Sequence, residues 1–224
     1  MRFITVLKFL LVLILPLLIL LMSMNLVSFD KSFYDKKFSE YKVREDVPDA
    51  MSLHEKVMNF IKGNNNTLPN ELTQREKEHL LDIRNLVRIS TIALYIFIIL
   101  FVLLLISSAL ILKVNNRIIN FIGKVLIFGG FLTIAIAASL FLFIISDFST
   151  SFESFHKLFF EKGTYLFDPA KEIIVNIYPE QLFMDLGIRI SAGVLITAAV
   201  IILFGLLLLL KSKKKKNKNN GFVR

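Results

Sequence analysis

The chain holds three histidines and no cysteine in 224 residues, so acid–base chemistry at neutral pH points first to His54, His79 and His156. His79 lies in the segment EHLLDIR, and Asp82 follows it three residues later on the same face of a helix. A carboxylate placed there can hold one tautomer of the imidazole and raise its basicity, as in a catalytic histidine–aspartate pair. The alternative is an exposed helix surface within a charge-rich run. His54, in the segment LHEKV, is expected to be a solvated position.

His156 lies in the stretch SFESFHKLFF, among four phenylalanines. Phe152, Phe155, Phe159 and the adjacent Phe160 form an apolar stripe at helical spacing, with His156 at its edge. This histidine is therefore either a packing residue with one good hydrogen bond or a titratable group held at a lipid–water boundary.

The sequence lacks the residues that several other kinds of chemistry require. Without cysteine the chain has no disulfide, no thiolate metal ligand and no cysteine nucleophile. It also contains no G-x-S-x-G, no H-E-x-x-H and no glycine-rich phosphate loop. His79, Asp82 and His156 are possible zinc ligands, but two ligands three residues apart plus one remote histidine are a common coincidence. We therefore expect no metal and no cofactor.

Four apolar stretches must position these residues. The chain is 55% hydrophobic with a mean hydropathy of +0.65. Residues 9–27, 89–112, 125–145 and 190–210 are each long enough to cross a hydrocarbon layer of about 30 Å. None contains Asp, Glu, Lys, Arg or His, which argues against a pump, ion channel or proton-coupled transporter. We predict an all-α integral membrane protein with four transmembrane helices, the first of them an uncleaved anchor.

The distribution of charge predicts the orientation. With four spans both ends lie on one side, together with loop 113–124 and tail 211–224, and this side carries 12 basic and no acidic residues. The other side holds all 18 acidic and the remaining 15 basic residues. Because lysine and arginine in short loops mark the cytoplasm, segments 28–88 and 146–189 are predicted to be extracytoplasmic. The net charge of +9 comes mostly from the tail and fits contact with membrane lipids, so we expect no nucleic-acid partner.

The two extracytoplasmic segments are expected to form a partly helical cap, in a single domain with the spans. Residues 29–43 are typical of an amphipathic element or an irregular strand, and DAMSLHEKVMNFIKG predicts a helix that ends near Gly63. Thr73 and Glu76 form a capping box, and no helix breaker lies between them and Ile89. One helix is therefore predicted to run from the capping box into the second span.

Two stretches of the sequence resemble a known family. They are HLLDIRNLV, from His79 to Val87, and the region from Phe155 to Asp185, which contains FHKLFF, TYLFDP and YPEQLFMD. Together with the four spans, they resemble the family of small bacterial membrane proteins that includes the lipoprotein intramolecular transacylase. One departure is Tyr165, where tryptophan is expected, and both are amphipathic aromatic residues.

The resemblance implies an enzyme of the bacterial cell membrane, with its active site at the outer leaflet. Its partners would be membrane lipids and diacylglyceryl-modified lipoproteins. It would move their sn-2 acyl chain to the α-amino group of the N-terminal cysteine, giving lyso-form lipoprotein. His79 and His156 match the essential histidines of the family and are the expected catalytic residues. The expected lining of the substrate pocket is Phe152, Phe155, Phe159 and Tyr165.

Within that reaction, His79 beside Asp82 is expected to be the base and His156 the acid or the oxyanion donor, with the reverse assignment left open. Arg84 is a candidate partner of the ester carbonyl. Both imidazoles must reach one substrate, so rings more than about 10 Å apart with no groove between them would argue against a two-histidine mechanism. Two other functions stay open. A non-enzymatic protein that binds lipid or lipoprotein would tolerate loss of either histidine, and a metal-dependent hydrolase would lose activity to chelators.

Overall fold

The computed structural model describes residues 2–113, 115–160 and 165–221, and within these ranges the chain is helical and forms no strand. The helices are α1 (Arg2–Val27), α2 (Lys31–Glu40), α3 (Val43–Asp46), α4 (Ala50–Ile61), α5 (Gln74–Leu112), α6 (Asn115–Ser146), α7 (Phe148–Phe159), α8 (Ile174–Ile177) and α9 (Glu180–Gly221). The predicted all-α fold class is confirmed.

The chain divides into two compact units, and α5, α6 and α9 contribute residues to both. One, called here the bundle unit, comprises Met1–Met24, Ala93–Leu140 and Ile190–Arg224. The other, the histidine unit, comprises Asn25–Ile92 and Phe141–Arg189 and contains all three histidines. That the whole chain acts as a single domain stays a prediction.

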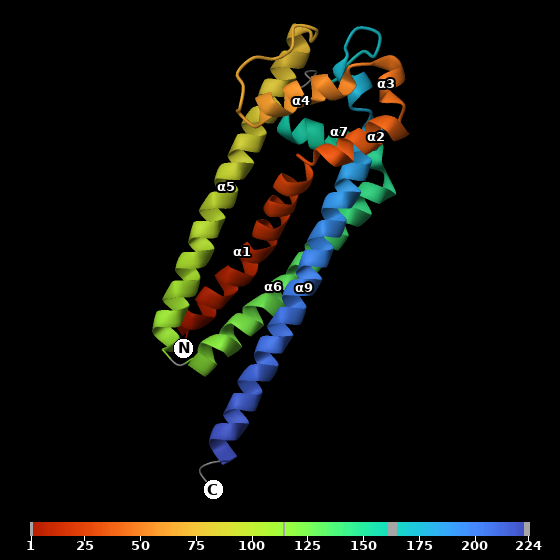
Figure 1. Ribbon diagram of the computed structural model, residues 1–224. Helices are drawn as coiled ribbons and strands as arrows, with labels where there is room; N and C mark the ends of the chain where they lie inside the picture. Colours follow the sequence, from red (N-terminus) through yellow and green to blue (C-terminus); the bar gives the residue numbers. More distant parts are fainter. Residues whose placement is uncertain (1, 114, 161–164, 222–224) are drawn as a thin grey trace. The chain divides into compact units, whose positions relative to one another are not determined.

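Four helices are long and apolar enough to cross a membrane, and each contains one of the predicted spans. They are Arg2–Val27, Gln74–Leu112, Asn116–Ser146 and Glu180–Lys214. At about 1.5 Å per residue, α5 extends about 58 Å, roughly twice the thickness of a hydrocarbon core, and it is drawn as one unbroken helix in Figure 1. The first turns of α5, which carry His79, therefore precede the apolar stretch that begins at Ile89.

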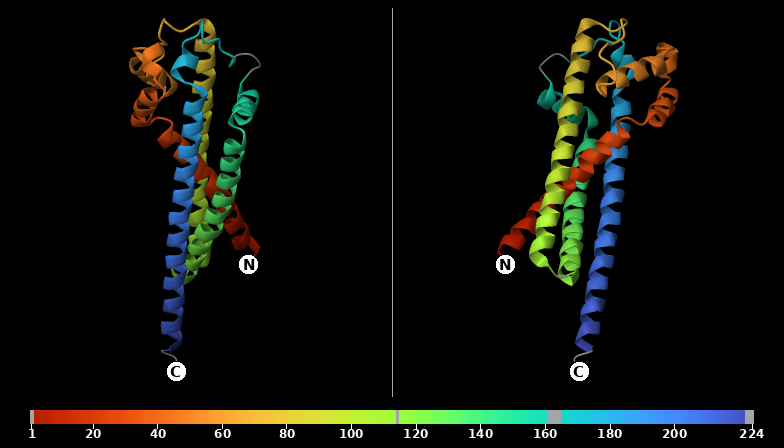
Figure 2. Two further views of the ribbon diagram at one scale, coloured as in Figure 1. Left: turned by 90° about the vertical axis from the view of Figure 1, so that its right-hand side faces the viewer. Right: turned by 60° about the vertical axis from the view of Figure 1, so that its left-hand side comes forward.

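In the bundle unit, glycines let α6 and α9 lie close together, as the views in Figure 2 show. A side-chain carbon at Gly205 would lie 2.9 Å from the carbonyl oxygen of Gly123, and one at Gly123 would lie 2.8 Å from the Leu209 side chain. Small residues at a contact between membrane helices allow this approach of the two backbones and strengthen van der Waals packing. α1 packs against α6 through a buried cluster of Leu7, Leu11, Phe121 and Val125.

In the histidine unit, α2 packs against α3 and α4. The carboxylate of Asp30 accepts the backbone N–H of Ser32 at 3.0 Å and caps the start of α2. The helix buries three aromatic side chains, those of Phe33, Tyr34 and Phe38. The amphipathic interpretation of this segment is confirmed, with a helix as the element, and the irregular strand is wrong.

Local signals around the start of α5 are also confirmed. α4 ends shortly before Gly63, which adopts the left-handed φ of +81° that favours glycine. In the capping box, the Glu76 carboxylate accepts the backbone N–H of Thr73 at 2.6 Å, and the Thr73 hydroxyl accepts the backbone N–H of Glu76 at 3.3 Å. α5 then continues to Leu112 as predicted.

Candidate active site

The structure brings His79 and His156 together. Their ring centroids lie 6.1 Å apart and their planes differ by 22°, so the two imidazoles are stacked. His79 comes from the second turn of α5 and is 5% exposed, and His156 comes from the last turn of α7 and is 8% exposed. This separation is shorter than the limit of about 10 Å that a two-histidine mechanism requires.

Hydrogen bonds at its start set the direction of α7. The carboxylate of Asp147 accepts the backbone N–H of Thr150 at 3.0 Å and its hydroxyl at 2.6 Å. The Ser151 hydroxyl donates to the carbonyl oxygens of Phe143 at 3.0 Å and Asp147 at 2.8 Å. These bonds tie α7 to the end of α6, and Ser151 and His156 are the residues that α7 buries.

The predicted aromatic stripe of α7 lies mostly outside the buried face. Phe155 and Phe159 are 44% and 48% exposed, and Leu158 beside them is 75% exposed. Phe152 is half-buried and packs on His156, with ring centroids 4.2 Å apart. His156 was expected at the edge of the stripe, and in the structure it is one of the two residues that α7 buries, with Ser151. The rings of Phe155 and Phe159 are therefore exposed.

Further aromatic rings enclose the two imidazoles. The ring centroid of His79 lies 4.8 Å from that of Phe160 and 5.3 Å from that of Phe167. The ring of Tyr165 lies 4.9 Å from that of His156. Tyr165 belongs to the predicted pocket lining, whereas Phe167 was not predicted to be near the histidines. The site is therefore polar at its centre and apolar around it.

His156 is oriented by its own helix. Its Nδ1 lies 2.7 Å from the carbonyl oxygen of Phe152. A carbonyl oxygen only accepts, so Nδ1 carries the proton and donates it to this bond. In the neutral ring Nε2 is then unprotonated and can accept a proton from a substrate. This is the arrangement expected of a general base.

His79 has no equivalent partner. Its Nδ1 is buried and, among the described residues, has no hydrogen-bond partner. The half-buried Asp82 makes no hydrogen bond with His79, so the predicted histidine–aspartate pair is not formed. Arg84 lies about 140° around the helix from His79. It donates to the side-chain oxygen of Asn66 at 2.9 Å and packs over the ring of Phe60, so it serves the loop after α4 rather than the histidines.

Burial sets the protonation of the pair. Burial, and after it the charge of His156, lowers the pKa of His79 to about 4. Burial also lowers the pKa of His156, while the hydrogen bond to the Phe152 carbonyl acts in the opposite direction. Both rings are therefore neutral at about pH 7. Among the described side chains, no group of three or more His, Cys, Asp or Glu could hold a metal ion.

His54 lies apart from this pair, and its predicted solvated position is wrong. Its side chain is 3% exposed, because it lies on the apolar face of α4 with Leu53 and Val57. Nδ1 of His54 lies 3.0 Å from the Tyr178 hydroxyl, and its ring centroid lies 4.1 Å from that of Tyr34. Burial lowers the pKa of His54 to about 4 and raises the pKa of Tyr178 well above its usual value. Both groups are uncharged at neutral pH.

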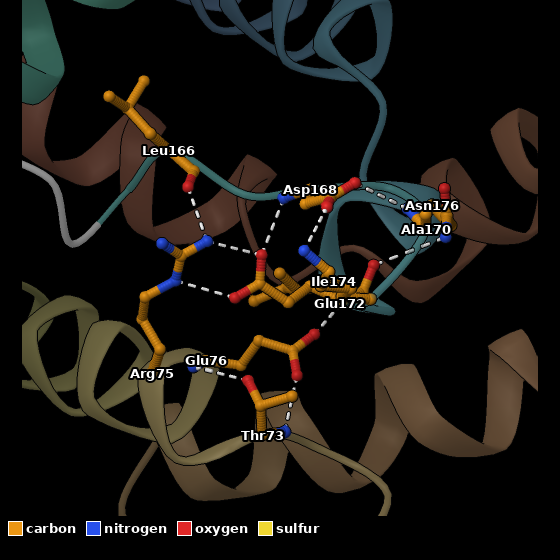
Figure 3. Close-up of polar contacts among 10 residues, drawn as sticks. Thr73, Arg75, Glu76, Leu166, Asp168, Ala170, Glu172, Ile174 and Asn176 are labelled. Carbon is orange, nitrogen blue, oxygen red and sulfur yellow. Dashed lines mark hydrogen bonds and ion pairs between the residues drawn. The ribbon is translucent and has the colours of Figure 1, made fainter.

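A polar network at the start of α5 was missed by the sequence analysis (Figure 3). The guanidinium of Arg75 binds both carboxylate oxygens of Glu172, and the buried carboxylate of Glu76 accepts the backbone N–H of Ile174 at 2.7 Å. Only the capping role of Glu76 could be predicted from the sequence. A partner 98 residues away leaves no local pattern.

The chain is similar to proteins of one known family. A model of the family lipoprotein intramolecular transacylase Lit matches residues 9–183. The in meso structure of the membrane integral transacylase Lit from Bacillus cereus is similar, with a TM-score of 0.84 and 21% identity over 95% of this chain and 99% of that chain. A structure of that protein with a histidine-to-arginine mutation has a TM-score of 0.79 and 20% sequence identity, over 96% of this chain and 95% of that chain. No curated protein matches the chain. Because the family model covers more than half of the residues, this chain belongs to the Lit family of lipoprotein intramolecular transacylases.

Proposed function

We propose that this protein transfers the sn-2 acyl chain of a diacylglyceryl lipoprotein to the α-amino group of the lipoprotein's N-terminal cysteine, and that His79 and His156 carry out the proton transfers. Membership of the family supports the reaction. The stacked and buried histidine pair is the observation that supports the site. Ester and amine belong to one molecule, so the transfer needs no activated acyl carrier.

The reaction forms one C–N bond and breaks one C–O bond. The neutral amine attacks the ester carbonyl carbon, and the tetrahedral intermediate collapses to an amide and the free sn-2 hydroxyl. The proton that nitrogen loses ends on the glycerol oxygen. A free α-amine has a pKa near 8, so a useful fraction is neutral at about pH 7. Protonating the departing alkoxide is the harder step, and a positioned histidine contributes about 10²–10⁴ in rate to such a transfer.

His156 is assigned as the base, the reverse of the assignment preferred from the sequence. Its Nδ1–H is engaged by the Phe152 carbonyl, so Nε2 takes the proton of the amine and returns it to the glycerol oxygen. His79, whose pKa of about 4 keeps it neutral, donates a ring N–H to the oxyanion that develops on the ester. Its Nδ1 has no partner among the described residues, and an unsatisfied buried polar atom is typical of a place where a ligand binds.

Open apolar side chains beside the pair are proposed to receive the acyl chains. Phe155 and Phe159 are the exposed rings of α7, and the ring centroid of Phe155 lies 5.6 Å from that of His156. Leu158 and Leu166 are 75% and 64% exposed. Apolar side chains that water would otherwise cover gain free energy when a lipid chain covers them instead. They therefore favour a substrate that brings its own acyl chains.

The site is proposed to work at the outer leaflet of the bacterial cell membrane, with both chain ends in the cytoplasm. The enrichment of lysine and arginine in the short loop 113–124 and the tail supports this orientation. His79 precedes the apolar stretch of α5, and His156 follows the end of α6, so both lie at the span ends that this proposed orientation makes extracytoplasmic. A lipoprotein anchored in that leaflet by its acyl chains meets the site without leaving the membrane.

Mass spectrometry of N-terminal lipopeptides tests this proposal in a bacterium that lacks N-acylation. Wild type is expected to give the lyso-form, and His79→Ala and His156→Ala are expected to leave the diacylglyceryl form while still inserted in the membrane. Lys157→Ala is the matched control, because this exposed side chain adjoins His156 and pairs only with the exposed Glu153 among the described residues. If wild type gives no lyso-form, the reaction is not the one proposed and a lipoprotein-binding role becomes the better explanation. If one histidine variant stays active, that histidine is a packing residue.

A further inference from the structure

Arg75 makes three hydrogen bonds at the start of α5 (Figure 3). Its guanidinium donates to both carboxylate oxygens of Glu172, at 2.7 and 2.5 Å, and to the carbonyl oxygen of Leu166 at 2.6 Å. Two parallel hydrogen bonds between a guanidinium and one carboxylate are strong and directional. The Glu172 side chain is 7% exposed and also accepts the backbone N–H of Asp168 at 2.7 Å. Arg75 and Glu172 therefore hold the segment around Phe167 from both sides.

The same guanidinium reaches His79 through one aromatic ring. Its central carbon lies 5.2 Å from the ring centroid of Phe167, and that ring meets the His79 ring edge to face at 5.3 Å. Arg75 precedes His79 by four residues, so both side chains lie on the same face of α5. A continuous path of contacts thus runs from Glu172 through Arg75 and Phe167 to the imidazole.

Glu76 provides a second attachment beside the first. It is fully buried, and one carboxylate oxygen accepts the backbone N–H of Ile174 at 2.7 Å while the other accepts the backbone N–H of Thr73 at 2.6 Å. Adjacent residues of α5 therefore bind both ends of the segment from Leu166 to Ile174. Both oxygens of this buried carboxylate are satisfied, so the attachment carries no unpaired polar group.

We propose that Arg75 is a positioning residue for His79. Together with Glu172 it holds the Phe167 ring against the imidazole, which fixes the ring plane and keeps water away from it. The proposal depends on the role in acyl transfer proposed above for His79. A hydrogen bond to one ring nitrogen usually orients a histidine that acts in catalysis. Nδ1 of His79 has no such bond among the described residues, so the packing of Phe160, Phe167 and His156 must set its orientation.

Loss of the ion pair should then change catalysis more than binding. A displaced catalytic group can cost up to about 10²-fold in rate, so we expect kcat to fall about 10- to 100-fold with KM within about threefold. Water that reaches His79 would raise its pKa from about 4 toward the ordinary 6.5, a change that titration of the ring detects directly. The titratable and charged residues of the described elements around it are Arg75, Glu76, Lys77, Glu78, Asp82 and Arg84 in the first turns of α5, Glu153, His156 and Lys157 on α7, and Tyr165, Asp168, Lys171 and Glu172 in the packed segment.

The experiment compares Arg75→Gln, Glu172→Gln and the double variant in the full-length protein. Arg44→Gln is the matched control, because Arg44 is 41% exposed against 43% for Arg75 and pairs with Asp35 elsewhere in the histidine unit. kcat and KM are measured on a synthetic diacylglyceryl lipopeptide from pH 4.5 to 8, and the His79 ring is titrated by NMR. Both single variants should lower kcat and raise the pKa of His79, and the double variant should be no worse than the worse single variant.

The NMR titration separates this proposal from the proposed function. If wild type makes no lyso-form, the reaction is wrong, yet a raised pKa of His79 in Arg75→Gln would still show that Arg75 positions the ring. If wild type is active and Arg75→Gln only lowers thermal stability, with kcat and the pKa of His79 unchanged, Arg75 is structural and the proposal fails. Should Arg75→Gln fail to fold, Phe167→Leu tests the same contact, with Phe167→Tyr as the conservative rescue.

Discussion

The histidine unit buries His54 in one place and the pair of His79 and His156 in another, and the hydrogen bonds of the imidazoles differ between the two places. His54 packs on Tyr34 and has the Tyr178 hydroxyl 3.0 Å from its Nδ1, so its environment resembles that of a core residue. His79 is as well buried, yet its Nδ1 has no partner among the described residues, and its neighbour His156 is oriented only through Nδ1. Burial alone therefore does not distinguish a packing histidine from a reactive one. What differs between the two sites is the hydrogen-bonding capacity left unused, and this difference supports the role proposed above for His79 and His156.

The energetic reason is the cost of an unpaired polar atom. A buried donor or acceptor without a partner costs about 1–3 kcal/mol, so native structures rarely keep one without a function. At His54 this cost is avoided by Tyr178, a residue that itself lies in the core around α2 and α4. At His79 no described residue removes this cost, because Nδ1 has no partner among them. The comparison between these two sites can be tested by substitution at each.

The largest expected contrast is in catalytic rate. His79→Gln should lower the rate of lyso-form production by about 10²–10⁴, because a proton-transfer or oxyanion-binding group is lost. His54→Gln should leave the rate per folded molecule within about twofold, since His54 contacts the tyrosines of the core and not the histidine pair. Initial rates on the lipopeptide, normalised to folded protein, measure both. An equal loss for the two variants would contradict the distinction.

The reverse contrast is expected in stability. His54→Ala removes a buried ring and leaves the Tyr178 hydroxyl unpaired, so it should cost about 2–4 kcal/mol of unfolding free energy. Tyr178→Phe should cost about 1–2 kcal/mol, and the double variant less than the sum of the two. Denaturant unfolding in detergent measures these values. Lys56→Ala, an exposed position on the same helix, should stay within about 0.5 kcal/mol.

The dependence of stability on pH gives a third comparison. The pKa of His54 is about 4 in the folded protein against 6.5 for an unperturbed histidine, so the unfolded chain binds the proton first as pH falls. The contribution of the neutral His54 ring to the free energy of unfolding is fully present above pH 6.5. As the pH falls from 6.5 to 4, about 3 kcal/mol of this free energy is lost. His79 acts in the same direction. Tm measured from pH 4 to 8 should therefore fall less steeply in His54→Phe than in wild type, and an unchanged slope would rule out this linkage.

The smallest effect is expected at Asp82. Because no hydrogen bond joins Asp82 to His79, Asp82→Asn should change kcat less than about threefold and leave the acid limb of the rate profile in place. The sequence pattern alone would predict a loss comparable to that of His79→Gln. His79 could be oriented by a carboxylate on its own helix or by the packed ring of Phe167. The rates of Asp82→Asn across the pH range distinguish these two explanations.

Local patterns determined much of this protein. Runs of about 20 apolar residues predicted the four spans, the Thr73–Glu76 spacing predicted the start of α5, and Gly63 marked the end of α4. Each depends on residues within one continuous stretch of the chain, where hydropathy, periodicity and capping act. The two histidine motifs also pointed to the family that the comparison confirms.

Only the tertiary structure decided which side chains meet. It placed His156 on His79, turned Phe155 and Phe159 outward, gave His54 a tyrosine partner 124 residues away and joined Arg75 to Glu172 across 97 residues. The helical spacing of Asp82 allowed a bond that the structure does not form. A buried polar atom takes its partner from whatever the fold brings within about 3 Å, and contacts between distant segments leave no periodic trace in the sequence.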